Sequence, residues 1–186
     1  MERYQGEVVA AQETKVLDSQ VAEVQSKLLS MGWKATFAPA IWTGEKGQEG
    51  LDQRHVSAGV MVACRSHMDA WPRTTEALQR FKGRLVAMNL RRKPLGWMIF
   101  YSAYFLTCEG LDYGLNEELL DTIRADIQSH GRPYIVAADF QWHHEMLEQT
   151  DFHRFLKGVV MACGEGTCRT AFGGATELDY FYVTPR

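Results

Sequence analysis

The sequence predicts an α+β fold in a single domain that covers residues 1–186. Two observations lead to this prediction: short apolar runs typical of strands alternate with segments of helical period, and no internal repeat or low-complexity linker interrupts them. The composition, 46% hydrophobic and 23% charged, is that of a globular chain with a sizeable core. Disordered and collagen-like classes are therefore excluded.

Charge and hydropathy limit the partners that the chain can have. A formal net charge of −3 gives no overall attraction to nucleic acid, so such binding would need a local basic face. No apolar run approaches the roughly 20 residues that a membrane helix needs. Residues 1–7 lack the basic and then apolar profile of a signal peptide. We expect an intracellular protein, cytoplasmic or nuclear, with no membrane segment.

The first half of the chain is predicted to begin with a buried strand at residues 8–11. A helix then starts at Asp18 or Ser19, both suitable N-caps, and its apolar residues keep helical spacing until Gly32. Residues 43–54 are rich in glycine and charge and are typical of an exposed loop. Two further strands are expected at residues 34–37 and 59–64.

The second half is predicted to contain more strands and two more helices. Asn116 is the expected N-cap of a helix through Ser129, and Gly131 and Pro133 are its stop signals. A shorter helix is expected at residues 144–149. Strands are predicted at residues 85–90, 97–104, 134–138 and 178–184. The first two of these strands form a hairpin through a basic turn.

Two acidic residues directly follow strongly apolar strands. Glu13 follows residues 8–11, and Asp139 follows residues 134–138. If neighbouring strands run in the same direction, both carboxylates emerge at one edge of the sheet. Oxygen ligands of this kind suit a hard cation, Mg²⁺ or Mn²⁺. The other interpretation is that each acid only begins a turn or caps a helix.

The segments around both acids resemble motifs of the endonuclease/exonuclease/phosphatase family. Residues 7–14, Glu-Val-Val-Ala-Ala-Gln-Glu-Thr, resemble its strand with the Gln-Glu-Thr signature, and residues 135–141 are similar to its strand that ends in Gly-Asp-Phe-Asn. Three further segments follow in the family's order. Residues 58–62 resemble its glycine-led strand, and residues 100–104 resemble its strand with the phosphate-contacting tyrosine. Residues 167–169 and 178–183 are similar to its late Thr and its Ile-Asp-Tyr strand. The resemblance implies a β-sandwich flanked by helices, in four layers α/β/β/α.

The resemblance also implies roles for five residues. In the family, a metal held by a glutamate polarises a phosphoester of nucleic acid or of another substrate. Carried onto this chain, Glu13 is a metal ligand and Asp139 is the metal-linked or water-activating carboxylate. Tyr104 contacts the phosphate, Gln141 stands where the family has Asn, and Asp179 is the candidate carboxylate that orients a histidine. Such chemistry depends on positioning and on charge stabilisation.

The sequence also departs from the family pattern. No strand with a metal-site Asn precedes the Gln-Glu-Thr motif, and no Ser-Asp-His follows the last strand. We therefore expect an incomplete version of the fold, with an uncovered sheet edge that favours self-association. His143 and His144 are the first candidates to replace the missing histidine, although an exposed pair opening a helix is the favoured interpretation of them. Weak metal binding and little nicking of plasmid DNA are expected.

Three functional hypotheses follow. The first is a divalent-metal phosphodiesterase similar to retroelement-type or apurinic-endonuclease-like domains, acting on DNA, RNA or another phosphoester. The second is a catalytically impaired or inactive remnant of that fold, which lacks the first-strand Asn and the terminal Asp-His. The third is an unrelated α/β phosphatase with Asp139 as nucleophile, and it leaves the other family matches unexplained.

Overall fold

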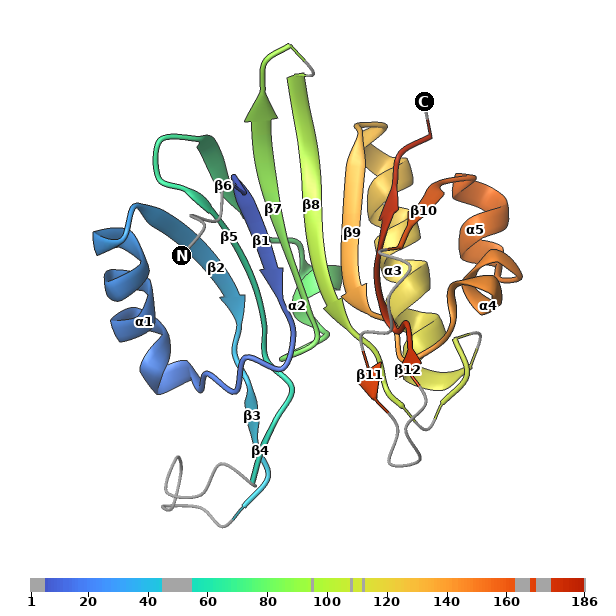
Figure 1. The fold of residues 1–186 in the computed structure, drawn as a ribbon, viewed down its shortest axis with the longest axis horizontal. Helices are drawn as coiled ribbons and strands as arrows, with labels where there is room; N and C mark the ends of the chain where they lie inside the picture. The colour runs from blue at the N-terminus through green and yellow to red at the C-terminus, as the bar shows by residue number, and fades with distance from the viewer. Residues whose placement is uncertain are drawn as a thin grey trace.

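The computed structural model describes residues 6–44, 55–94, 96–107, 109–111, 113–162, 168–169 and 175–185, with no side-chain detail at 168–169 and 175–176. Within them, two main β-sheets face each other and helices lie on their outer sides (Figure 1). The chain thus has the four-layer α/β/β/α architecture that the resemblance implied. Thr167 and most of the predicted loop at 43–54 lie outside the described residues.

The first sheet is three-stranded and antiparallel, in the order β1-β5-β2. Helix α1 lies beside β2 and buries none of its residues completely (Figure 1). The short strands β3 and β4 pair with each other at one end of this sheet. The bounds of these elements are β1 (Val8–Ala11), α1 (Asp18–Ser30), β2 (Trp33–Ala38), β3 (Ile41–Trp42), β4 (Val56–Ser57) and β5 (Val60–Arg65).

The second sheet is six-stranded, in the order β10-β13-β9-β8-β7-β6. Its strands pair antiparallel except for β8 and β9, because helix α3 crosses over between them. The strands are β6 (Asp69–Arg73), β7 (Leu85–Arg92), β8 (Gly96–Tyr104), β9 (Tyr134–Asp139), β10 (Val159–Met161) and β13 (Asp179–Val183). The helices of this part of the chain are α2 (Glu76–Gln79), α3 (Gly114–His130), α4 (His144–Glu148) and α5 (Asp151–Leu156). Two further short strands, β11 (Cys168–Arg169) and β12 (Ala175–Thr176), pair with each other.

Strand β8 separates two hydrophobic cores. Successive side chains of a strand point to opposite faces. Ile99, Tyr101 and Ala103 therefore pack against the helices, whereas Phe100 packs between the sheets with apolar residues of β5 and β7. Among the described helices, none is both long and apolar enough to span a bilayer.

The polar side chain of Gln12 joins the two sheets. Its Nε2 donates to Ser102 Oγ at 3.0 Å and to the carbonyl of Ala137 at 3.1 Å. Ser102 is 0% exposed, so this contact lies inside the sandwich. It fixes the end of β1 against β8 and β9, directly before Glu13.

A second polar contact fixes helix α3 on the opposite face of the second sheet. Arg73 makes a bidentate pair with Asp126, with both N···O distances 2.7 Å, and the Tyr101 hydroxyl donates to the same carboxylate at 2.6 Å. Burial raises the pKa of Asp126, but these hydrogen bonds outweigh burial and hold it below its usual value. The ionised carboxylate therefore connects β6, β8 and α3.

Two predicted helix caps were wrong. The N-cap of α1 is Leu17, whose N–H donates to the side chain of Gln20 at 3.0 Å, and not Asp18 or Ser19. Asn116 is buried within the first turn of α3, and its amide binds both backbone groups of Leu106. The carboxylate of Glu109 accepts a backbone N–H at the start of α3. At α1 the cap is still local but is made by Leu17 and Gln20, whereas at α3 contacts with residues before the helix take the place of the predicted Asn116 cap.

Strand β1 is only half-buried, which corrects the prediction of a buried strand. It lies at the edge of the first sheet and pairs with β5. Its other edge has no strand partner within the described residues. This matches the expected uncovered edge, and self-association through it stays a prediction.

We expect Gln12→Leu to lower the free energy of unfolding by about 1–3 kcal/mol, because the Ala137 carbonyl and the buried Ser102 hydroxyl lose the donor that the Gln12 amide supplies. Gln25→Leu is the matched control, since the Gln25 amide binds the Ala35 carbonyl at an exposed position. Urea unfolding followed by tryptophan fluorescence measures both. Equal losses in the two variants would contradict a structural role for the buried contact.

Candidate functional site

The structure brings four of the predicted site residues to one end of the sandwich. Glu13 follows β1, Tyr104 ends β8, Asp139 ends β9 and Asp179 begins β13. Asp139 pairs with Tyr104 in the parallel ladder and with Asp179 in the antiparallel ladder. These strand ends lie together in the lower half of Figure 1. Glu13 and Asp139 are therefore on the same side of the domain.

A hydrogen bond between Tyr104 and Glu13 joins the two sheets at this end of the sandwich. The Tyr104 hydroxyl donates to Glu13 Oε1 at 2.7 Å, and Lys15 Nζ lies 3.8 Å from the same oxygen. Half of the Glu13 side chain is exposed, so its carboxylate is open to a ligand. Burial and the Glu13 charge raise the pKa of Tyr104 well above its usual value, so the phenol stays protonated and acts as a donor.

The backbone around the site is strained. Glu13, Lys15 and Gln141 have φ values of 51°, 55° and 61°, a region that residues other than glycine rarely adopt. Such conformations cost of order 1 kcal/mol each and concentrate at functional sites. The placement of these three residues agrees with a functional role for the two turns that carry them.

Gly59 makes the first of these turns sterically allowed. The Thr14 N–H donates to the Gly59 carbonyl at 2.9 Å, and Gly59 has a φ of 94°. A Cβ atom on Gly59 would lie 2.6 Å from Thr14 Oγ1. Only glycine fits this close contact, which explains the glycine that precedes β5.

Three carboxylates are near one another at this site. Burial, followed by the negative charges of Asp179 and Glu13, raises the pKa of Asp139 to about 6. The repulsion would be relieved by a cation, and an all-oxygen donor set suits Mg²⁺ or Mn²⁺ better than softer metals. The residues present thus fit a hard divalent ion.

Gln141 contacts Asp139 directly. Its Nε2 donates to Asp139 Oδ2 at 2.6 Å, and its backbone N–H donates to Oδ1 at 3.1 Å. The sequence prediction gave this amide the phosphate contact that the family's Asn makes. In the structure the amide orients the Asp139 carboxylate instead.

The sequence prediction missed Arg84, which lies beside Tyr104. Its guanidinium is 5.3 Å from the centre of the Tyr104 ring, and its Nη1 is 3.3 Å from the Tyr104 carbonyl. Burial lowers the pKa of this half-buried arginine, and the nearby Tyr104 and Glu109 act on it in the opposite direction. The pairing of Leu85 with Ala103 places Arg84 next to Tyr104. The register of the predicted hairpin could therefore have indicated this arginine.

The two candidate histidines lie at the start of α4, but only His143 is exposed as the favoured interpretation predicted for both. His143 is the N-cap, exposed, and His144 is the first helical residue, half-buried against Tyr180. In the described part of the chain, no histidine hydrogen-bonds to Glu13, Tyr104 or Asp139. The site there consists of carboxylates, a tyrosine, an amide and nearby cations.

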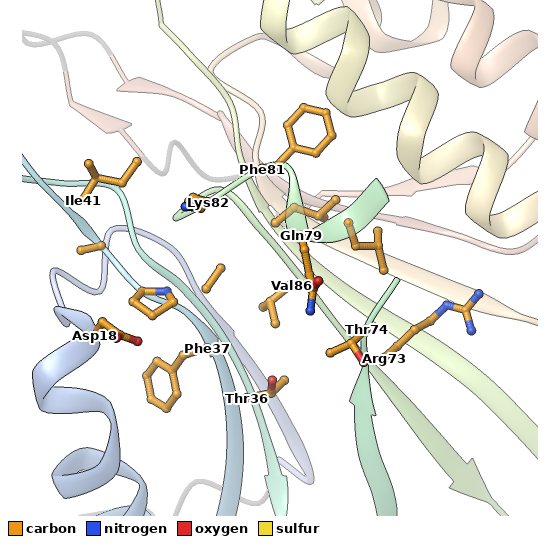
Figure 2. Close-up of a pocket in the computed structure, with 15 residues that line it drawn as sticks. Asp18, Thr36, Phe37, Ile41, Arg73, Thr74, Gln79, Phe81, Lys82 and Val86 are labelled. Carbon is orange, nitrogen blue, oxygen red and sulfur yellow. The ribbon is translucent and has the colours of Figure 1, made fainter. Parts of the chain in front are cut away.

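A cavity of about 560 Å³ lies elsewhere, between β2, its following turn and α2 (Figure 2). Phe37, Ile41, Phe81 and Val86 are among its lining residues, and none of the predicted site residues is. A smaller hollow of about 270 Å³ borders the carboxylate site, between Gln12 and Asp179. We take the carboxylates as the candidate site, because the larger cavity lacks a comparable cluster.

No protein-family model and no curated protein matches the sequence. Solved structures do match. The human Nocturnin catalytic domain with bound sulfate is 16% identical, with a TM-score of 0.61 over 97% of this chain and 70% of that one. ANGEL2, a 2′,3′-cyclic phosphatase, is 13% identical with the same TM-score of 0.61 and the same coverage of 97% and 70%. An endonuclease/exonuclease/phosphatase family protein from Bacteroides thetaiotaomicron is 12% identical, with a TM-score of 0.57 over 97% and 70%. These likenesses show the fold.

We expect Asp139→Asn to be more stable than the wild type at pH 8 and to lose that advantage at pH 4. The folded-state pKa of Asp139 is raised from 3.8 to about 6, so the wild type loses stability as the pH rises through this window. Allowing for solvent at a half-buried group, the gain should be about 1 kcal/mol.

Urea unfolding in the presence of a chelator measures this difference. Asp121→Asn is the control, because the side chain of Asp121 is 52% exposed on α3. A loss of stability in Asp139→Asn that is equal at both pH values would show that the carboxylate is not destabilised by its neighbours.

Proposed function

We propose that this chain, which has the endonuclease/exonuclease/phosphatase fold, is a divalent-metal-dependent phosphoester hydrolase that acts on nucleic acid. The observation that carries this proposal is the convergence of Glu13, Tyr104, Asp139 and Asp179 from four strands of two sheets. A structural role alone would not require three carboxylates in mutual repulsion at a solvent-accessible edge.

Glu13 and Asp139 are the proposed ligands of Mg²⁺ or Mn²⁺. When bound, such an ion polarises a phosphoryl oxygen and neutralises charge that develops in the transition state. The exposed Glu13 carboxylate and the half-buried Asp139 supply the hard oxygen donors. Asp179 adds negative charge beside Asp139 and so favours cation binding.

The remaining residues have roles that follow from their contacts. The protonated Tyr104 hydroxyl is a donor that can turn from Glu13 to a phosphate oxygen. Gln141 holds the Asp139 carboxylate in a fixed orientation, which suits a group that positions an attacking water. Arg84 is a partly desolvated cation beside Tyr104, and we assign to it the neutralisation of the substrate phosphate.

A nucleic-acid phosphodiester is the proposed substrate class. One structural neighbour, ANGEL2, is a 2′,3′-cyclic phosphatase, so this fold accommodates a phosphoester of that kind. Lys15 and Arg84 flank the carboxylates and provide the local positive charge that the net charge of −3 lacks. Weak binding that decreases with salt is therefore expected.

A second candidate function is a metal-binding domain without turnover. The amide of Gln141 is engaged by Asp139 and not offered to a phosphate. Within the described residues, no histidine touches Glu13, Tyr104 or Asp139. Removal of one transition-state contact typically lowers kcat by a factor of about 10² to 10³, so this arrangement favours slow chemistry.

We expect the purified chain to bind Mg²⁺ or Mn²⁺ weakly and the double variant Glu13→Gln, Asp139→Asn to lose this binding. Titration of Mn²⁺ by electron paramagnetic resonance measures the free ion. Glu7→Gln is the control, because Glu7 precedes the other end of β1 and pairs with Arg92. Unchanged affinity in the double variant would show that the two carboxylates are not the metal site.

The same variants test catalysis. We expect slow, metal-dependent hydrolysis of bis(p-nitrophenyl) phosphate, little nicking of plasmid DNA, and a loss of at least about 10²-fold in Asp139→Asn. Metal binding without any turnover of the diester would support the second candidate function. Turnover that survives in Asp139→Asn would exclude the proposed role of that carboxylate.

We expect Arg84→Gln to raise KM for the diester by about 10- to 100-fold while leaving Mn²⁺ binding unchanged, because a charge-assisted contact to phosphate contributes about 1.5–3 kcal/mol. Arg84→Lys should restore part of the loss. Arg80→Gln, at the C-cap of α2, is the control, since its side chain is 70% exposed. An unchanged KM in Arg84→Gln would show that the guanidinium does not meet the substrate.

A further inference from the structure

We propose that His143, His144 and Glu145 bind a late transition-metal ion, with Zn²⁺ as the representative, at a site separate from the carboxylates. One ligand atom from each of the three side chains lies within 4.8 Å of the other two. Such a site does not depend on the proposed hydrolase activity, because it shares no residue with Glu13 and Asp139.

The sheet holds one of the three ligands in place. The ring of His144 packs edge-on against Tyr180, with 6.3 Å between the ring centres. Tyr180 in turn stacks on Phe140 at 4.2 Å in the core beneath the helices. His144 therefore projects from a rigid base at the start of α4.

The neighbouring side chains are near this fixed ring. The His143 ring lies 4.3 Å from the His144 ring, at an angle of 38°. The Nδ1 atom of His143 is 3.8 Å from a carboxylate oxygen of Glu145. The side chains of His143 and Glu145 are 46% and 73% exposed, so both have room to adjust around an ion.

One nitrogen of His144 lacks a partner. Its Nδ1 is fully buried and has no hydrogen bond within the described residues. Buried polar atoms are normally satisfied, and a bound ion is one of the arrangements that accounts for an exception. A metal bound at this nitrogen would use its lone pair, with the other two side chains closing the site.

The donor types select the class of metal. Two imidazole nitrogens with one carboxylate oxygen suit Zn²⁺ and its late first-row neighbours, whereas Mg²⁺ prefers oxygen ligands alone. Metal–nitrogen bonds of about 2.1 Å would draw the mobile side chains of His143 and Glu145 toward His144. Three protein ligands leave one position open in a tetrahedral site. The ion would also fix the segment that follows Gln141.

Zn²⁺ titration by calorimetry tests the proposal, with the full chain freed of any histidine tag and with Mg²⁺ in excess. Co²⁺ substitution, read from visible absorption, reports the ligand set. We expect one Zn²⁺ per chain and at least tenfold weaker binding in His144→Ala and in Glu145→Gln. His67→Ala, in an exposed turn between β5 and β6, should bind like the wild type.

Two results would overturn the proposal. One is the absence of stoichiometric Zn²⁺ binding, or binding that is unchanged in the double variant His143→Ala, His144→Ala. The other is loss of Zn²⁺ binding in Glu13→Gln, Asp139→Asn, which would place the ion at the carboxylates. Circular dichroism checks the fold of each variant. If His144→Ala unfolds, the exposed Glu145→Gln gives the answer alone.

Discussion

The contact of Gln12 with Ser102 and Ala137 is the constraint on which the candidate site depends. It joins β1 to β8 and β9 inside the sandwich, and the next residue along the chain is Glu13. With this register set, Tyr104 lies within hydrogen-bonding distance of Glu13. The turn that follows keeps its unusual backbone because Gly59 has no side chain. A single half-buried amide thus helps to determine where an exposed carboxylate lies relative to the second sheet.

The candidate site combines a fixed geometry with unfavourable charge repulsion and backbone conformations. A sheet edge with only a structural role would not need this combination. Asp139 and its acidic neighbours repel each other, and positive φ values occur on both turns that carry site residues. The larger cavity, in contrast, is lined largely by apolar side chains and has no such cluster. Electrostatic conflict and backbone strain, more than empty volume, therefore mark the candidate site in this molecule.

The strands that carry the site were predictable from sequence, because their apolar runs are strong and bounded by turns. Their meeting point was not predictable from periodicity alone and came from the ordered family motifs. The apolar pattern of the sequence did not predict β6, because Pro72 and its charged neighbours are atypical of a strand. Such residues are tolerated only in an edge strand, which is where β6 lies. Asn116 was mistaken for a cap because local propensity cannot reveal burial against Leu106. Arg84 was missed because its role depends on the register of a hairpin.

The division of the site between two sheets affects how the molecule opens and folds. The first sheet comes from residues 8–65 and the second from residues 69–183. The backbone of each sheet pairs only within its own part of the chain, whereas the two sheets share the apolar core between them. Fluctuations that separate them would dismantle the carboxylate cluster while leaving most backbone pairing intact. A ligand shared by Glu13 and Asp139 would suppress that motion, and slower amide hydrogen exchange in both sheets would then report occupancy of the site.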